Sequence, residues 1–163
     1  NIQVGDDLEI SAKPSGTLTL AHLELGGNLW LVATGTGIAP FISLLRDPSI
    51  YDEFQRVIVI HSVREIDDLA YDSFLAEQEI FYYPIVTRDK LYPRNKRITK
   101  SIYDEDIFNN LGLTPWKCDN DKVMLCGNIE FNKEMSFYLE SNGWQQGNQK
   151  RAGNYVQEKA FVG

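Results

Sequence analysis

The segment 28–40, Asn-Leu-Trp-Leu-Val-Ala-Thr-Gly-Thr-Gly-Ile-Ala-Pro, constrains the fold more than any other part of the chain. Five apolar residues (29–33) predict a buried strand, and Gly35 and Gly37 predict a tight turn into a helix that has Pro40 in its first turn. A helix N-terminus after such a turn suits a pyrophosphate. Many strand–helix turns carry two glycines for steric reasons only, so this turn alone leaves nucleotide binding open.

The rest of the chain alternates predicted strands with predicted helices. Continuous apolar strands that alternate with helices indicate a parallel sheet covered on both faces. We therefore expect an α/β fold with a doubly wound, five-stranded parallel sheet, in which the ends of the first and fourth strands lie side by side where ligands bind. The predicted strands are 29–34, 57–62, 82–87, 122–126 and 155–162, and the predicted helices are 38–46, 67–79, 102–111 and 130–142.

The first 27 residues have a different pattern. Residues 8–11 and 17–20 alternate apolar and polar side chains, which predicts β structure too small to bury its own face. We interpret 1–27 as the end of a preceding β domain and 28–163 as the nucleotide-binding domain, and expect the chain to be a piece of a longer one. Around Ile80 a predicted helix meets a predicted strand without turn residues, so either a connection is shortened there or residues are absent.

Charge and hydropathy narrow the classes of partner. The formal net charge of −7 argues against a general nucleic-acid binder or a protein that binds anionic membranes. No apolar run approaches the roughly 18 residues that span a bilayer, and the chain does not begin with a signal peptide. Its two cysteines form no disulfide framework and fit a reducing cytoplasm.

Six strings in the chain are informative together: LWLVATGTGIAPF (29–41), VIVIHSVRE with DLAY (57–65 and 68–71), YYPIVTRD (82–89), KRIT (96–99), VMLCGN (123–128) and YVQEKAFV (155–162). They resemble, in order, those of bacterial ferredoxin/flavodoxin–NADP(+) reductases. The resemblance implies an FAD-dependent oxidoreductase that moves electrons between NADPH and ferredoxin or flavodoxin, with a β-barrel FAD domain before the NADP domain. We expect a monomer.

The resemblance also implies cofactor-binding residues after the first and second strands. Gly35, Thr36 and Gly37 form the turn, and Thr36 corresponds to a threonine that touches the flavin. Val63 and Arg64 follow the second strand, where dinucleotide folds bind the adenosine ribose.

Further basic residues at matching positions favour NADP over NAD. Thr87, Arg88 and Arg97 resemble the rest of the family's phosphate clamp. An arginine suits a 2′-phosphate, whereas an acid suits the bare 2′-hydroxyl of NAD. Because Glu65 adjoins Arg64, that position alone does not decide between the two cofactors; three arginines together favour NADP.

The end of the fourth strand is the third implied part of the site. The resemblance places Cys126 beside the nicotinamide, and has Asn128, Ile129, Glu130 and Glu134 line the cofactor path. Ile129 departs from versions of the motif with proline after the asparagine. By its own residues, Cys126 reads equally as a buried core cysteine.

The C-terminal segment completes the predicted site. Ala160 and Phe161 resemble the residues that pack on the flavin and adenine rings, and Glu158 is a candidate proton donor near the flavin. His22 and His61 have no partner pattern and are interpreted as structural. The three tryptophans are interpreted as core or packing residues: Trp30, Trp116 and Trp144.

Two other functions remain open at this point. The chain could be the NADH-dependent reductase module of an oxygenase or flavohaemoglobin. It could also be a non-catalytic nucleotide-binding module, because most of the flavin site lies outside it.

Overall fold

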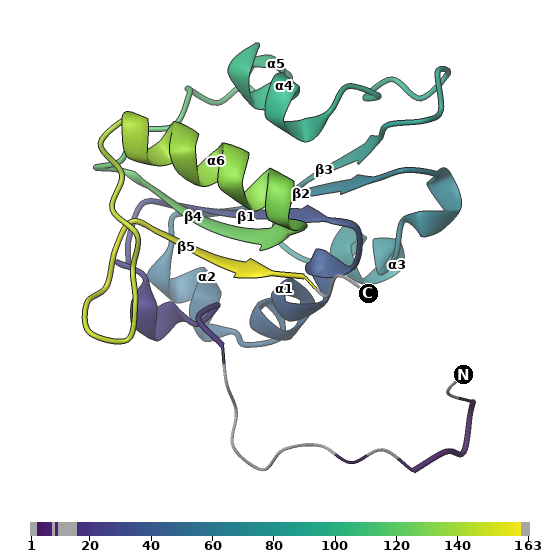
Figure 1. Ribbon diagram of the computed structural model, residues 1–163, viewed down its shortest axis with the longest axis horizontal. Coiled ribbons are helices and arrows are strands. Elements are labelled where there is room, and N and C mark those ends of the chain that lie inside the picture. The colour runs from purple at the N-terminus through teal and green to yellow at the C-terminus, as the bar shows by residue number, and fades with distance from the viewer. Residues whose placement is uncertain (1–2, 8, 10–15, 161–163) are drawn as a thin grey trace.

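The computed structural model describes residues 3–7, 9 and 16–160 of the chain. Its centre is one parallel five-stranded sheet in the order β3-β2-β1-β4-β5, which confirms the expected doubly wound α/β fold (Figure 1). The strands are β1 (Asn28–Thr34), β2 (Arg56–Val63), β3 (Phe81–Val86), β4 (Asp121–Gly127) and β5 (Tyr155–Lys159).

Helices cover both faces of this sheet (Figure 1). One face carries α1 (Ile38–Leu45), α2 (Ser49–Glu53) and α3 (Asp72–Ala76), and the other carries α4 (Ile98–Tyr103), α5 (Asp106–Leu111) and α6 (Ile129–Ser141). Three short 3₁₀ turns complete the described elements: η1 (Leu20–His22), η2 (Gly35–Gly37) and η3 (Ile66–Asp68).

The strands are apolar throughout because each face of the sheet has its own core. Leu31 and Ala33 of β1 pack in the cluster beneath α1, whereas Trp30 and Val32 pack in the cluster beneath α4, α5 and α6. This division follows from the alternation of side chains along a strand. Trp30 and Trp144 are buried in the second cluster and Trp116 packs against it, as expected for core tryptophans.

The strand order places the ends of β1 and β4 side by side. Ala33 of β1 is in register with Cys126 of β4, and Thr34 is in register with Ser62 of β2. The turn after β1 and the end of β4 therefore meet at the switch point of the sheet, as expected from the assumed strand order.

Two predicted helices are wrong in extent. The helix expected over 67–79 is a 3₁₀ turn and the short α3, separated by Tyr71, which has a φ of +66°. The helix expected over 102–111 is two helices, α4 and α5, separated by Glu105 with a φ of +60°. A residue with left-handed backbone angles cannot continue a right-handed helix. Tyrosine and glutamate rarely adopt this conformation, so the sequence did not predict either break.

The described part of the segment before β1 contains no named strand. Residues 17–20, predicted as β structure, form bends and the start of η1, while Leu18 and Leu23 are buried against the core beneath α1. Most of 8–11 lies outside the described residues, and so do the last two residues of the strand predicted over 155–162. Near Ile80, residues 77–80 turn the chain into β3.

Candidate nucleotide-binding site

The glycine turn between β1 and α1 lies directly against the end of β4. Gly35 has a φ of +54°, a conformation that glycine adopts without strain. A Cβ atom on Gly37 would lie 2.1 Å from the carbonyl oxygen of Cys126, so only glycine permits this close approach. The sequence therefore needs both glycines, each for a different reason.

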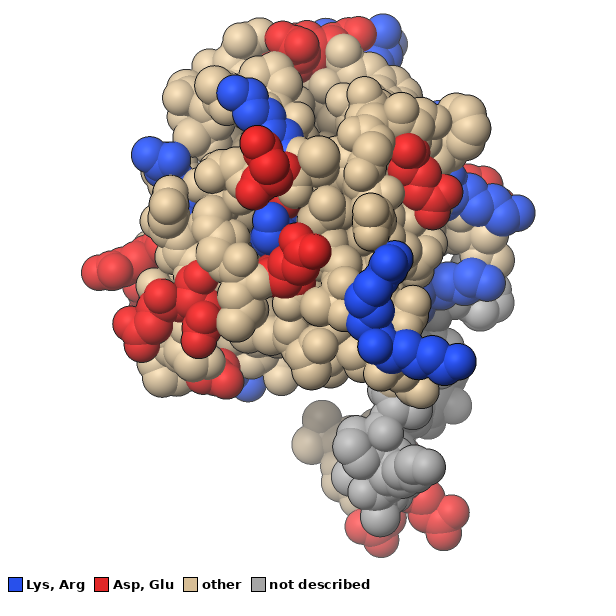
Figure 2. All heavy atoms as spheres, turned by 90° about the vertical axis from the view of Figure 1, so that its left-hand side faces the viewer, with Lys and Arg blue, Asp and Glu red and all other residues tan. Residues whose placement is uncertain are grey.

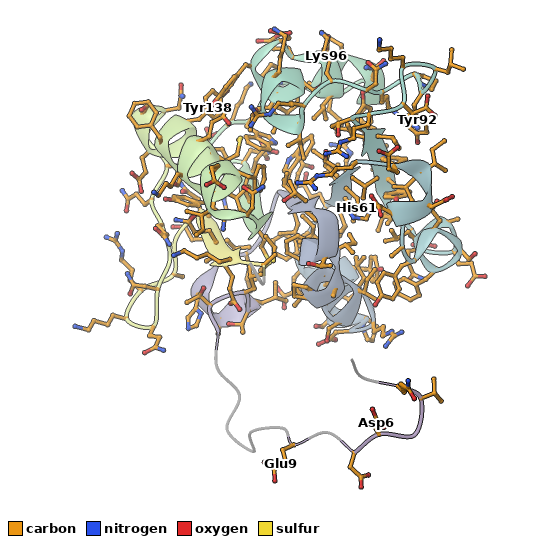
Figure 3. The ribbon with its side chains drawn as sticks, turned by 45° about the vertical axis from the view of Figure 1, so that its right-hand side comes forward. Asp6, Glu9, His61, Tyr92, Lys96 and Tyr138 are labelled. Atoms are coloured by element: carbon orange, nitrogen blue, oxygen red, sulfur yellow. The ribbon has the colours of Figure 1, made fainter. Side chains whose placement is uncertain are left out.

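A cleft of about 710 Å³ opens at the carboxyl ends of the strands, beside this turn. Figure 3 brings this side of the molecule forward, with His61 next to the start of α1 and the loop that carries Tyr92 and Lys96 across from it. The cleft brings together most residues predicted for the cofactor. Those that line it are Gly35, Thr36, Val63, Arg64, Thr87, Arg88, Arg97, Asn128, Glu130 and Ala160.

Three arginines reach this cleft from different segments of the chain. Arg64 follows β2, Arg88 follows β3, and Arg97 is the residue that precedes α4. A backbone hydrogen bond joins the segments after β2 and β3: the Arg88 N–H donates to the Arg64 carbonyl at 3.0 Å. Thr87 adds a hydrogen bond from Oγ1 to the Val63 carbonyl at 3.1 Å. Three segments of the chain thus each contribute an arginine to the lining of the cleft.

Arg94 anchors the loop that connects Arg88 to Arg97. Its guanidinium carbon lies 4.8 Å from the centre of the Tyr83 ring, within cation–π range. Its carbonyl accepts a hydrogen bond from the Val86 N–H at 3.0 Å. Arg94 does not line the cleft, so the segment from Arg88 to Arg97 contains both cleft-lining and anchoring arginines.

The start of α6 also contributes to the lining of the cleft. Asn128 caps this helix: its Oδ1 accepts from the Phe131 N–H at 2.8 Å. Ala160 is held beside it, because the Ala160 N–H donates to the Gly127 carbonyl at 2.9 Å. A helix of this length presents a positive dipole end and free N–H groups to the cleft.

Cys126 lies beneath the turn and outside the lining of the cleft. Its side chain is buried in the cluster under α1, since the alternation of β4 turns it away from the helix α6. Burial, and to a smaller extent the charge of Glu158, raises the pKa of the Cys126 thiol to about 11. The thiol is therefore protonated at neutral pH, and the residue supports the turn from below.

Four further predicted residues among those that the structure describes lie outside the cleft lining: Gly37, Ile129, Glu134 and Glu158. Glu158 accepts hydrogen bonds at Oε2 from the Thr17 N–H at 2.7 Å and the Leu18 N–H at 3.3 Å, so its carboxylate holds the segment before β1. Ile129 lines a separate groove of about 280 Å³ between α6 and β5. Phe161 lies outside the described residues.

Several residues of the cleft were not predicted. Thr34 ends β1 and Ser62 is the last residue but one of β2, and polar residues near strand ends are the signal that could have identified them. Thr99 was hidden because the helix that contains it begins at Ile98, four residues before the predicted start. The lining residues missed are Thr34, Ser62, Asp68, Ile98, Thr99 and Phe131.

The surface at the end of the sheet opposite the cleft carries charges of both signs (Figure 2). Figure 2 views the side that contains the amino ends of the strands, and there acidic and basic side chains are interspersed over the surface. Among the described residues, no helix has both the length and the apolar character needed to cross a bilayer.

The chain is similar in sequence to a family of nucleotide-binding domains and to several reductases. Residues 31–136 match the family described as oxidoreductase NAD-binding domain. The chain is 37% identical over its full length to a ferredoxin–NADP reductase of Sorangium cellulosum, of which it covers 63%. It is 34% identical to the ferredoxin–NADP reductase of Azotobacter vinelandii, with 99% of this chain and 68% of that protein aligned.

A solved structure gives the same result at the level of the fold. The ferredoxin NADP⁺ reductase of Neisseria gonorrhoeae, with bound FAD and NADP, superposes with a TM-score of 0.80 at 29% identity. The match covers 90% of this chain and 61% of that protein. The chain thus spans less than two thirds of the length of the Sorangium and Neisseria proteins.

Proposed function

The chain belongs to the oxidoreductase NAD-binding domain family, and from this premise we propose that it is the NADP-binding part of an FAD-dependent ferredoxin/flavodoxin–NADP reductase. In this proposal residues 28–163 bind NADP and residues 1–27 are the end of the FAD-binding β-barrel. The names of the relatives support ferredoxin or flavodoxin as the electron-transfer partner. A cytoplasmic, monomeric protein is part of the proposal; the free thiols of Cys118 and Cys126 support a reducing compartment.

One observation carries the choice of NADP. Arg64, Arg88 and Arg97 come from three segments and line one cleft beside a glycine turn and a helix N-terminus. A guanidinium presents several N–H donors to a phosphate, so three of them favour a ligand with an extra phosphate.

The cleft offers groups for each end of a dinucleotide. The backbone of the turn at Gly35 and Thr36 suits the pyrophosphate, and the arginines suit the 2′-phosphate. The nicotinamide end would then contact the remaining lining residues, which are Asn128 and Glu130 at the start of α6 and Ala160 after β5. When bound, NADPH would supply a hydride, and FAD would allow its two electrons to pass one at a time to the carrier protein. The residues of this chain contribute binding and orientation, while Cys126 supports the turn without acting as a nucleophile.

Nucleotide selectivity tests the proposal. In the full-length protein, Arg64→Ala and Arg97→Ala should each weaken NADPH binding about ten- to a hundred-fold, because a charge-assisted hydrogen bond contributes roughly 1.5–3 kcal/mol. NADH binding should change little. Equal losses for both cofactors would contradict a 2′-phosphate site and favour an NADH-dependent module. A full-length protein without flavin absorption would favour a binding module over an enzyme.

A further inference from the structure

Two of the three cleft arginines are already paired with carboxylates. Nη1 of Arg88 lies 3.8 Å from Oε1 of Glu65, and Nη2 of Arg97 lies 3.5 Å from Oε2 of Glu134. Among the described residues, Arg64 has no ion pair. The two acids come from different elements, the segment after β2 and the helix α6, so the pairs form independently.

We propose that Glu65 and Glu134 are exchangeable counter-ions that set the selectivity of the cleft between ligands with and without a 2′-phosphate. This inference rests on the proposed function, because it assumes that a 2′-phosphate binds at these arginines. It changes the role expected for Glu134 from a cofactor contact to a partner of Arg97. It also gives Glu65, which argued against NADP in the sequence, a role in an NADP site.

The geometry of the pairs favours exchange over permanent bridging. Neither distance corresponds to a short bidentate pair, and the guanidinium side chains of Arg88 and Arg97 are 60% and 71% exposed. Exposed pairs of this kind are weak and screened by salt. A phosphate with more charge and three acceptor oxygens competes well for the same N–H groups.

The exchange affects only ligands that carry the extra phosphate. A 2′-phosphate must displace the two carboxylates before it gains the arginines, and it then lies near two negative charges. A ligand with a bare 2′-hydroxyl leaves both ion pairs intact, so it neither displaces the carboxylates nor brings a phosphate charge close to them. The acids therefore lower the affinity for the 2′-phosphate below what the arginines alone would give.

A purely structural role for the acids predicts a different result. Glu65 and Asp68 form a capping box at η3: the Glu65 side chain accepts from the Asp68 backbone, and Oδ2 of Asp68 accepts from the Glu65 N–H. If the Glu65 and Glu134 carboxylates served only to hold the loops, their removal would leave the arginines less ordered and would weaken phosphate binding. If they are counter-ions, their removal tightens phosphate binding. The sign of the effect separates the two roles.

The test is titration calorimetry of the full-length protein with adenosine 2′,5′-bisphosphate and with adenosine 5′-monophosphate. Glu65→Gln and Glu134→Gln should each tighten binding of the bisphosphate about two- to five-fold. The combined variant should give about the product of the two gains. Binding of the monophosphate should be unchanged. Asp67→Asn is the matched control: it removes an exposed charge close in sequence to Glu65 from a residue that, among the described residues, forms no ion pair with a cleft arginine.

Three results would overturn the inference. Unchanged or weaker bisphosphate binding in both Gln variants would assign the acids a structural role. A gain of equal size in Asp67→Asn would show that general charge, and not the pairs, is responsible. If the protein of natural sequence did not prefer the bisphosphate over the monophosphate, the proposed function would fail as well, and this outcome is distinguishable from the other two.

Discussion

Nε2 of His61 lies 2.9 Å from the carbonyl oxygen of Gly35. Since a carbonyl only accepts, Nε2 carries the proton and donates it to the glycine turn. The ring is fully buried, and its Nδ1 has no partner among the described residues. His61 is therefore a neutral histidine that joins β2 to the turn at the cleft.

This environment predicts a pH-dependent stability. Burial lowers the pKa of His61 below its usual 6.5, although the hydrogen bond to Gly35 and the charge of Asp72 oppose the shift. In the unfolded chain the histidine takes up its proton first as the pH falls. The free energy of unfolding should thus decrease below about pH 6.5, with a slope of up to about 1.4 kcal/mol per pH unit.

Urea unfolding at a series of pH values measures this dependence. His61→Gln retains an N–H donor for Gly35 but does not titrate, so the decrease between pH 7 and pH 5 should become smaller. His22→Gln is the matched control, because His22 is the other histidine and lies outside the cleft. The same decrease in the His61 variant as in the natural protein would assign the acid sensitivity to other groups.

The role of His61 shows where sequence reasoning reached its limit. A structural histidine was expected, but its contact with Gly35 depends on the register of β1 and β2, in which Ala33 lies opposite His61. Apolar runs and turn residues predicted the strands well, because parallel strands are buried on both faces. The arginines were placed for a related reason: Arg64 and Arg88 follow strand ends, which meet at one edge of any parallel sheet.

Other features depend on contacts between distant residues. Glu158 stays a predicted proton donor near the flavin, but the sequence did not indicate that its carboxylate accepts hydrogen bonds from Thr17 and Leu18, some 140 positions earlier in the chain. Cys126 was expected beside the nicotinamide, but its side chain packs in the core beneath α1. The motif identifies the position of this residue in the chain but not the face of β4 from which its side chain projects. The breaks at Tyr71 and Glu105 are backbone conformations that tertiary packing imposes on ordinary residue types.

The close approach at Gly37 predicts a steric effect of substitution. Gly37 has an ordinary φ of −61°, so alanine there is not strained by its backbone. Its Cβ would nevertheless collide with the carbonyl of Cys126. Gly37→Ala should destabilise the protein by about 1–3 kcal/mol, as overpacking does, and should weaken nucleotide binding by displacing the turn.

Thermal unfolding and nucleotide titration would measure both effects. Gly35→Ala is the comparison, since a Cβ there meets open space and only the left-handed φ of +54° opposes it. Full stability of Gly37→Ala would show that β4 can move away from the turn.

The burial of Cys126 predicts a slow reaction with alkylating agents. A thiol with a pKa of about 11 is almost entirely protonated at pH 8, and only the thiolate reacts. Cys118 is half-buried and should be labelled first. Mass spectrometry of peptides after iodoacetamide treatment would show the order, and in urea both cysteines should react at similar rates. Rapid labelling of Cys126 in the folded protein would contradict the buried thiol.

Among the substitutions considered, we expect removal of the Asp121 carboxylate, at the start of β4, to cause the largest loss of stability. It is buried and accepts hydrogen bonds from Asn28 Nδ2 and Trp30 Nε1, both at 2.9 Å, and from the Lys117 N–H at 2.8 Å. Asp121→Ala would leave these donors without an acceptor, at a cost of about 2–4 kcal/mol in urea unfolding. Asp121→Asn keeps one acceptor oxygen and should cost less, while Asp119→Ala, at an exposed neighbour, should cost little. Because Asp121 lies at the end of the sheet opposite the cleft, nucleotide affinity in the folded fraction should not change. A loss below about 0.5 kcal/mol in Asp121→Ala would mean that water reaches these donors.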